Sequence, residues 1–147
     1  MENFEIIILK FASPEYLQAL SLRDKVLRKP LGMSIYDDDL SDEESQIHVA
    51  AILEGKVAGI LLLRRVSADT VQMRQVAVAE PLQGNGIGRS LVLFSEEVAK
   101  NNAYRKIMLH ARETAVLFYE KLSYTKVSDS FTEVSITHFE MEKIIVI

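Results

Sequence analysis

Hydrophobic positions divide the first part of the chain into one strand-like run and one helical run. Residues 4–11 are apolar and rich in β-branched side chains, which predicts a mostly buried strand. Between residues 14 and 29 the apolar positions recur every three to four residues, which predicts a helix. Ser13 suits the cap of this helix and Pro14 suits its first turn, whereas Pro30 favours an end near residue 29.

Three further strands are predicted before the middle of the chain. Residues 47–53 and 57–66 are apolar runs separated by Glu54-Gly55-Lys56, which is typical of a hairpin. A third run over 70–79 follows a polar turn. Because short turns join these three strands in sequence, we expect an antiparallel meander.

The second half alternates strands and helices. The predicted elements are an amphipathic helix over 89–100, a strand over 105–111, a short helix over 114–122, and strands over 124–128 and 135–145. The resulting order is β-α-β-β-β-α-β-α-β-β. A strand, helix and strand over 70–111 imply one right-handed parallel crossover inside a mixed sheet, so the fold class is α/β of the α+β kind.

Composition restricts the classes of protein to which the chain can belong. Its 147 residues, 48% apolar and 26% charged, predict a single soluble domain over 1–147. The absence of cysteine excludes a disulfide framework, a thiolate metal site and a cysteine nucleophile. A net charge of −4 argues against a nucleic-acid partner. The sequence shows no membrane-spanning run and no signal peptide, so we expect a cytoplasmic protein without a membrane partner.

An acidic segment lies between the first predicted helix and the first hairpin. Residues 37–44 contain six carboxylates among eight positions. Such a run is typical of a solvated loop or short helix. The alternative is a face that attracts a cation.

Half of the glycines lie within five residues of one another. Of six glycines in the chain, Gly84, Gly86 and Gly88 stand between a predicted strand and a predicted helix. Glycines at such a junction let the backbone turn tightly, and the first N–H groups of the helix form an anion site. Arg89 excludes the dinucleotide-binding pattern, and Gly88-Arg89-Ser90 excludes a Walker loop. A plain turn with spare glycines remains the alternative.

Two segments around this turn carry a family resemblance. The pattern Gln83-x-x-Gly86-x-Gly88, preceded by an apolar strand, resembles the acetyl-CoA signature Q/R-x-x-G-x-G/A of the GNAT family of N-acetyltransferases. Residues 115–124 are similar to the second conserved helix of that family.

A narrower resemblance points to the ElaA-like bacterial subgroup. It rests on scattered positions along residues 20–143, and these positions are Arg23, Val26, Asp42, His48, Leu109-His110-Ala111, and the series Phe131, Glu133, Ile136, His138 and Met141.

The resemblance implies a fold and a cofactor site. The implied fold is a mixed, mostly antiparallel sheet of about six to seven strands, flanked by helices, with a central β-α-β crossover. The implied co-substrate is acetyl-CoA, whose pantetheine arm would bind the backbone of Val76, Ala77 and Val78. Its pyrophosphate would lie in a cradle of backbone N–H groups formed by Gln83, Gly84, Asn85, Gly86, Ile87, Gly88 and Arg89.

The resemblance also implies catalytic roles. The backbone N–H of Val78 would polarise the thioester carbonyl, as a preorganised donor does. Tyr119 matches the family's general acid, which returns a proton to the departing thiolate. The alternative for Tyr119 is a half-buried helix residue packed beside Phe118 and Leu122.

The base that removes the ammonium proton is not identified by the pattern. The strand before the glycine turn offers Gln72, Arg74 and Gln75, where the histone-modifying branch of the family has a glutamate. His138 is a candidate base because histidine titrates near neutral pH. Glu133 and a chain of water molecules are the other candidates, and His138 can equally be a packed structural residue.

The remaining details concern structural roles. We interpret His48 and His110 as structural residues in apolar strands, and no metal site is expected because no His, Asp and Glu set has ligand spacing. Ser123 stands where the family often has glycine, so the sequence does not predict the C-cap geometry of the preceding helix.

These observations predict an acetyl-CoA-dependent N-acetyltransferase acting directly on a primary amine of a small molecule or peptide. The acidic segment over 37–44 favours a cationic acceptor. The alternative is a non-catalytic CoA-binding regulatory module, which the missing strand carboxylate favours. A homodimer through an exposed edge at the apolar end of the chain, residues 144–147, is also considered.

Overall fold

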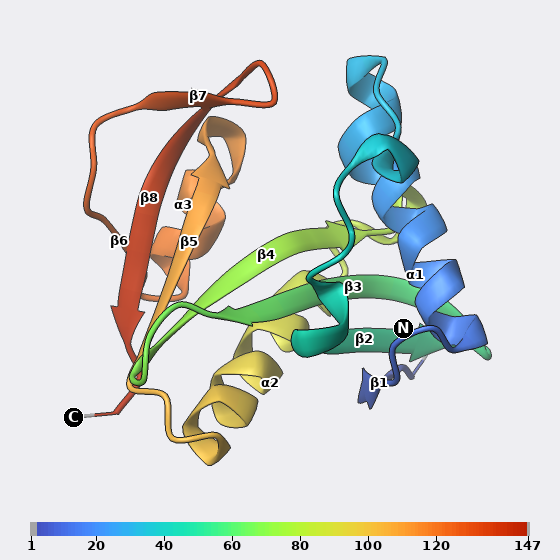
Figure 1. Ribbon diagram of the computed structural model, residues 1–147, viewed down its shortest axis with the longest axis horizontal. Coiled ribbons are helices and arrows are strands. Elements are labelled where there is room, and N and C mark those ends of the chain that lie inside the picture. The colour runs from blue at the N-terminus through green and yellow to red at the C-terminus, as the bar shows by residue number, and fades with distance from the viewer. Residues whose placement is uncertain (1–2, 147) are drawn as a thin grey trace. The chain divides into compact units, whose positions relative to one another are not determined.

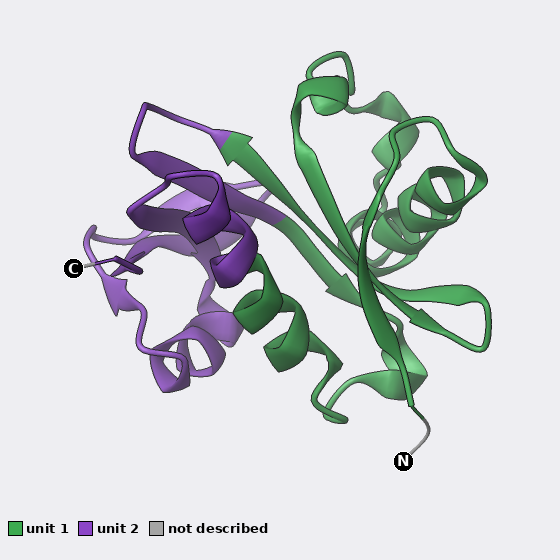
Figure 2. Cartoon of the chain, turned by 90° about the horizontal axis from the view of Figure 1, so that it is seen from below, with its two compact units in different colours: residues 1–64, 75–95 green, residues 65–74, 96–147 purple. Residues whose placement is uncertain are grey.

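The computed structural model describes residues 3–146. The elements in chain order are β1 (Glu5–Leu9), α1 (Pro14–Arg23), β2 (Ile47–Leu53), β3 (Lys56–Arg65), β4 (Thr70–Val78), α2 (Ile87–Asn101), β5 (Lys106–Arg112), α3 (Val116–Lys121), β6 (Thr125–Lys126), β7 (Phe131–Glu133) and β8 (Ile136–Ile144) (Figure 1). The chain forms two compact units, one of residues 1–64 and 75–95, the other of residues 65–74 and 96–147 (Figure 2). Both β4 and α2 are therefore divided between the units.

Across the described residues the strands form a mostly antiparallel eight-stranded sheet, which confirms the predicted fold class. In the first unit β1, β2 and β3 pair antiparallel. In the second unit the first residues of β4 pair parallel with β5, from Thr70↔Lys106 to Met73↔Leu109. Strand β8 is antiparallel to β5, and both β6 and β7 pair with β8.

The sequence analysis missed one strand, β7. It has only three residues, too few to show an alternation of apolar and polar positions. Its turn into β8 consists of Val134 and Ser135, both with positive φ (45° and 63°). Neither residue is typical of such a turn, which is why the hairpin has no recognisable sequence signal.

The first unit has helices on both faces of its strands. Ser13 caps α1 as predicted, because its side chain accepts a hydrogen bond from the N–H of Tyr16 at 3.2 Å. One strand face packs against α1, and this core consists of Leu9, Tyr16, Ala19, Leu20, Leu22, Ile35, Ala50, Ile60, Leu62 and Ala77. On the other face a Cβ on Gly59 would come within 2.8 Å of Leu91 and 3.1 Å of Ile87. Glycine at position 59 thus allows α2 to approach the strands closely.

The predicted first hairpin is confirmed. Leu53 pairs with Lys56, and the two residues between them, Glu54 and Gly55, both have positive φ (52° and 76°). Two left-handed residues in a two-residue loop match the right-handed twist of the flanking strands.

The predicted first helix differs in its last turns. Regular α-helix stops at Arg23, residues Asp24–Arg28 are π-helical, and a single 3₁₀ turn over Lys29–Leu31 follows. The difference is confined to these last turns, and Gly32 ends the segment in the left-handed conformation (φ 69°).

Strand β8 is paired on both sides only as far as Glu142, so the predicted dimer through residues 144–147 stays a prediction. It pairs with β5 from Arg112↔His138 to Lys106↔Ile144, and with β7 and β6 on its other side. The N–H of Ile145 continues this pairing by donating to the carbonyl of Arg105 at 2.9 Å. Ile147 lies outside the described residues. No helix among residues 3–146 is long and apolar enough to cross a membrane.

Candidate functional site

The glycine turn connects the end of β4 to the start of α2 within the first unit. After Val78, the N–H of Ala79 donates to the carbonyl of Ala58 on β3 at 2.9 Å, and a 3₁₀ turn spans Glu80–Leu82. Gly84 and Gly86 both have left-handed φ, 86° and 85°, and a Cβ on either would meet nothing within 4 Å. These two positions need glycine for their backbone conformation, and not for lack of space.

The backbone N–H groups of this turn are of two kinds. Those of Gln83 and Asn85 donate within the turn, to the carbonyls of Glu80 and Leu82 at 3.2 and 3.4 Å. The first bond of α2 runs from the N–H of Ser90 to the carbonyl of Gly86 at 3.0 Å. The N–H groups of residues 86–89 therefore precede the first intrahelical bond, and the helix dipole makes this end attractive to anions. An anion cradle here would be built from residues 86–89.

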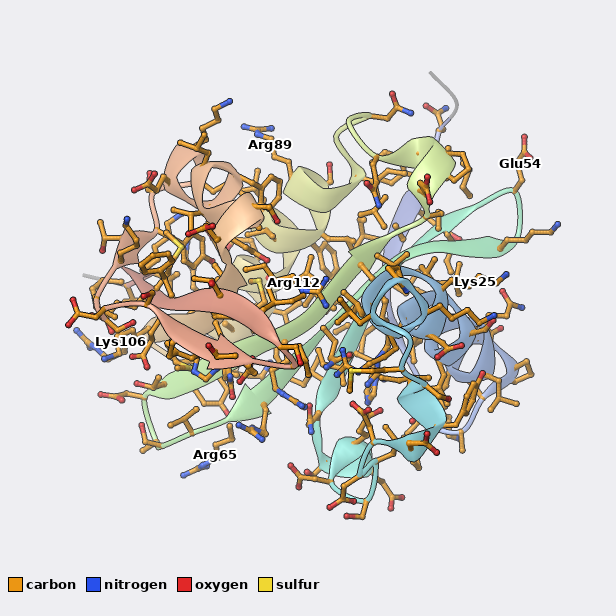
Figure 3. The ribbon with its side chains drawn as sticks, turned by 90° about the horizontal axis from the view of Figure 1, so that it is seen from above. Lys25, Glu54, Arg65, Arg89, Lys106 and Arg112 are labelled. Atoms are coloured by element: carbon orange, nitrogen blue, oxygen red, sulfur yellow. The ribbon has the colours of Figure 1, made fainter. Side chains whose placement is uncertain are left out.

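The side chain of Gln83 has a bracing role in this turn. Its Nε2 donates to the carbonyl of Val78 at 3.0 Å, so the amide holds the loop against the last residue of β4. Arg89 is exposed, and its side chain extends away from the ribbon at the start of α2 (Figure 3). A cation in this place adds to the attraction for a polyanion.

Strand β4 contains a distortion just before the predicted pantetheine-binding segment. Gln75 has a φ of 57°, a conformation that a residue other than glycine rarely adopts inside a strand. Its side-chain Oε1 accepts a hydrogen bond from Nε of Arg23 at 3.3 Å. The sequence analysis missed this distortion, because glutamine is not a signal for left-handed backbone.

Arg23 belongs to a buried polar network that pattern reasoning also missed. Arg23 and Glu43 are 1% and 2% exposed, and the guanidinium donates to both carboxylate oxygens at 2.8 and 2.6 Å. The hydroxyl of Tyr16 donates to Oε1 of Glu43 at 2.9 Å, and Nε2 of His48 bonds the backbone carbonyl of Glu43 at 2.8 Å. The network therefore fastens the acidic segment to α1 and β2.

Burial and hydrogen bonding shift the pKa values within this network. Burial and the bond to Glu43 raise the pKa of Tyr16 to about 12. Burial lowers the pKa of His48, so this imidazole is neutral. Burial by itself raises the pKa of Glu43, but the hydrogen bonds and charge of Arg23 outweigh it and keep this pKa below its usual range. Glu43 is therefore an ionised partner of Arg23 and a poor general base.

The acidic segment is thus only partly a solvated loop. Glu43 is buried, and Asp38 is half-buried and forms an ion pair with Arg28 at 2.8 Å. Just before the acidic segment, the N–H of Ile35 donates to Oδ1 of Asp24 at 2.8 Å in a further buried contact. The expectation of a solvated loop or short helix therefore holds in part, since Ile35–Asp37 and Glu43–Ser45 are 3₁₀ turns. Glu43 and Asp38 are not fully solvated, because Arg23 and Arg28 pair with them. The exposed carboxylates are Asp37, Asp39, Asp42 and Glu44.

Tyr119 lies on α3 in the second unit. It is 7% exposed, and its ring makes edge contacts with Phe118 and Tyr124 at centroid distances of 5.0 and 5.8 Å. Burial raises the pKa of its phenol, which keeps the proton on the oxygen at neutral pH. The position suits either a packed residue or a proton donor.

The backbone around Tyr119 is held by a helix C-cap. The N–H of Tyr124 donates to the carbonyl of Tyr119 and that of Ser123 to Glu120, both at 3.0 Å. Ser123 takes the left-handed conformation at φ 75°. This pair of bonds is the Schellman motif, so serine adopts the conformation for which glycine is best suited.

His138, the candidate base, belongs to a cluster on β5, β7 and β8. It is 4% exposed, and its Nδ1 bonds the carbonyl of Ile136 at 2.8 Å. Its Nε2 lies 3.7 Å from Oε2 of Glu133, whose Oε1 lies 3.1 Å from Nδ1 of His110. Glu133 thus bridges two imidazoles, and His110 takes part in this polar cluster in addition to its place in the strand. Among residues 3–146 no group of three or more such side chains could hold a metal ion.

Comparison with known proteins assigns the chain to a family. A family model described as "Acetyltransferase (GNAT) domain" matches residues 24–145. The chain therefore belongs to the GNAT family of acetyltransferases, as its sequence resemblance implied. The uncharacterised protein YyaT of Bacillus subtilis is 29% identical over 130 residues, which cover 86% of each chain.

Solved structures share the fold. Escherichia coli ElaA has a TM-score of 0.81 at 19% identity, over 97% of this chain and 99% of that one. An aminoglycoside 6'-N-acetyltransferase complexed with coenzyme A has a TM-score of 0.79 at 19% identity, over 97% of each chain. At these identities the similarity establishes the fold, and the chemistry rests on the family and on the site itself.

Proposed function

We propose that the protein transfers the acetyl group of acetyl-CoA directly to a primary amine. The observation that carries this proposal is the junction after β4 of a GNAT chain, where two left-handed glycines precede a helix whose first N–H groups are directed out of its end. A pyrophosphate is the anion that such a cradle suits. In the related aminoglycoside enzyme the structure holds coenzyme A, which supports the same ligand here.

In this proposal the end of β4 and the turn that follows it bind the donor. Residues 86–89 give backbone N–H groups to the pyrophosphate, while Gly84 and Gly86 shape the loop. The peptide groups of Val76, Ala77 and Val78 hold the pantetheine arm, and the N–H of Val78 polarises the thioester carbonyl. Because Gln83 occupies the Val78 carbonyl, that carbonyl is held in a fixed direction. The thioester supplies the activated acetyl group.

Tyr119 and His138 supply the proton chemistry in this proposal. Tyr119 is protonated at neutral pH and acts as a hydrogen-bond donor that passes its proton to the departing sulfur. His138 accepts the proton of the attacking ammonium through Nε2, since its Nδ1 already bonds the carbonyl of Ile136. Glu133 faces that Nε2 and stabilises the imidazolium that forms.

The acceptor is a cationic amine in this proposal. Four exposed carboxylates remain on the segment over 37–44 after two others are paired with arginines. Their field attracts a positively charged acceptor to this segment. A screen of polyamines, amino sugars and lysine-like amines against neutral and anionic amines tests the point, and acetylation confined to neutral or anionic amines would contradict it.

The test of the function is binding followed by turnover. Saturating acetyl-CoA should raise the melting temperature, because a ligand of the native state stabilises it by mass action. CoA release should follow when the correct amine is added. An unchanged melting curve at saturating acetyl-CoA rules the proposal out.

The second candidate is a CoA-binding regulatory module without turnover. One observation favours it, namely that Glu43, a buried carboxylate near the β4 distortion, is held by Arg23 and cannot act as base. Tyr119→Phe separates the two functions, since an enzyme should lose most of its kcat while keeping its acetyl-CoA affinity. A module without catalysis binds acetyl-CoA and releases no CoA with any amine.

A further inference from the structure

The left-handed residue of β4 lies directly before the backbone that we propose binds the donor. Gln75 has a φ of 57°, and Val76 follows it in the chain. Glutamine gains nothing from this conformation, since only glycine, and to a lesser degree asparagine and aspartate, adopt it readily. An interaction elsewhere in the fold must therefore hold the residue there.

The side chain of Gln75 has such an interaction. Its Oε1 accepts from Nε of Arg23 at 3.3 Å, while the two terminal nitrogens of Arg23 are occupied by Glu43 at 2.8 and 2.6 Å. All five donors of a guanidinium lie in one plane, so two fixed terminal nitrogens also fix the direction of Nε. Arg23 thus presents one oriented donor to the distorted residue.

Further hydrogen bonds hold the carboxylate that pairs with Arg23. Arg23 and Glu43 are almost fully buried, and Tyr16 donates to the same carboxylate oxygen at 2.9 Å. His48 bonds the backbone carbonyl of Glu43 at 2.8 Å. Arg23 alone contacts the Gln75 amide, and Glu43, with Tyr16 and His48 bonded to it, holds Arg23 in place.

We infer that Arg23 and Gln75 are positioning residues, which hold the distortion of β4 so that the peptide groups of Val76–Val78 face the donor thioester. The inference rests on the proposed function. The N–H that polarises a carbonyl must be aligned with the developing oxyanion, and a misplacement of about 1 Å can cost about 10²-fold in rate. The cradle at residues 86–89 does not depend on this tether.

The test uses Gln75, because substitution of Arg23 would leave the buried Glu43 carboxylate without its partner. Gln75→Leu removes the acceptor at similar size and should lower kcat at least tenfold. The dissociation constant of 3′-phospho-ADP, the part of CoA that has the pyrophosphate but no pantetheine arm, should change less than about threefold. Gln75→Glu keeps the length and the acceptor and should retain kcat. Gln18→Leu is the matched control, since its amide bonds Val57 on β3 at 3.2 Å, and it should retain kcat.

Gln75→Asn distinguishes the effect of the hydrogen bond to Arg23 from the residue's own preference for left-handed backbone. Asparagine adopts left-handed φ more readily but is one methylene too short to keep the 3.3 Å contact. If Arg23 holds the distortion, Gln75→Asn resembles Gln75→Leu. If it retains wild-type kcat, the inference is overturned.

Amide hydrogen exchange of the ligand-free protein gives a second readout that does not depend on activity. The peptide covering residues 75–78 should exchange at least tenfold faster in Gln75→Leu and Gln75→Asn than in the wild type, with the Gln18→Leu control unchanged. Unchanged exchange and kcat in both Gln75 variants overturn the inference alone. Absence of acetyl-CoA binding and turnover in the wild type instead overturns the proposed function.

Discussion

Single residues in this protein adopt conformations that their side chains do not favour. Ser123 ends α3 at φ 75°, and Ala103 ends α2 in the same way at φ 68°. After α2 the N–H of Tyr104 donates to Ala99 and that of Ala103 to Lys100, both at 3.0 Å, so both helices end in the same motif. A left-handed residue with a side chain costs roughly 1–2 kcal/mol relative to glycine.

Glycine should therefore stabilise both helix ends. Ser123→Gly and Ala103→Gly should each raise the free energy of unfolding by about 1 kcal/mol, or Tm by about 3 °C. The two positions end different helices, so we expect the double variant to add the two effects. Thermal unfolding of the three variants measures this. A Tm below that of the wild type for Ala103→Gly, an exposed position, would contradict the conformational argument.

The buried ion pair of the first unit predicts a strong non-additive effect. Arg23→Met should cost about 3–5 kcal/mol, because it leaves a buried carboxylate uncompensated. The double variant Arg23→Met with Glu43→Leu should recover most of that loss, since well-packed apolar replacements of buried pairs are often neutral. Urea unfolding of the double-mutant cycle measures the coupling energy. Equal destabilisation by the single and the double variant would show that the carboxylate is not the source of the cost.

At the scale of elements, a glycine in the turn between β4 and α2 can be compared with a glycine outside the proposed site. Gly86 and Gly32 are both left-handed (φ 85° and 69°), and a Cβ on either would meet nothing within 4 Å. Their replacement by alanine therefore carries the same kind of backbone cost. Only Gly86 lies at the proposed anion cradle.

This pair gives a matched test of the cradle. Gly86→Ala and Gly32→Ala should each destabilise by about 1 kcal/mol. Gly86→Ala should also weaken acetyl-CoA binding at least tenfold, whereas Gly32→Ala should bind as the wild type does. Calorimetric titration with acetyl-CoA measures both affinities. Equal affinities in the two variants would place the phosphate contacts outside this turn.

At the scale of the whole molecule, the buried network makes stability depend on pH on both sides of neutrality. Burial holds the pKa of His48 below 6.5, so below that pH the unfolded chain binds a proton that the folded chain does not. The pKa of Tyr16 is raised from 10 to about 12, so above pH 10 the unfolded chain loses a proton that the folded chain keeps. Stability contributed by these groups is therefore present between about pH 6.5 and 10 and decreases outside this window.

Urea unfolding midpoints across the pH range measure this dependence. His48→Gln keeps a donor toward the Glu43 carbonyl and should remove the decrease that begins near pH 6.5. The further loss below about pH 4.5, where the Glu43 carboxylate protonates in the unfolded chain, should persist in that variant. If the unfolding midpoints of the wild type and of His48→Gln change equally with pH between pH 5 and 6.5, His48 is not the group responsible.

Local patterns were sufficient for the elements that repeat a period or contain turn residues. Ser13 and Pro14 predicted the start of α1, Glu54-Gly55 predicted the first hairpin, and the glycines after β4 predicted a strand-to-helix turn. Each of these features depends on backbone preferences over a few residues, which the sequence states directly. The family resemblance followed from the glycine turn and from residues 115–124.

Only the tertiary structure decided which polar residues are buried and what they hold. Arg23, Glu43 and Gln75 are up to 52 positions apart and have no shared pattern, yet they meet in one network. Strand β8 is rich in apolar residues, and only the fold shows that its partners are β5 on one side and β6 and β7 on the other. The sequence alone determined the glycine turn of the proposed donor site, because turns and caps are local. The distortion of β4 and the network that holds it were decided by long-range contacts, because a buried charge is stabilised only by the partner that the fold brings to it.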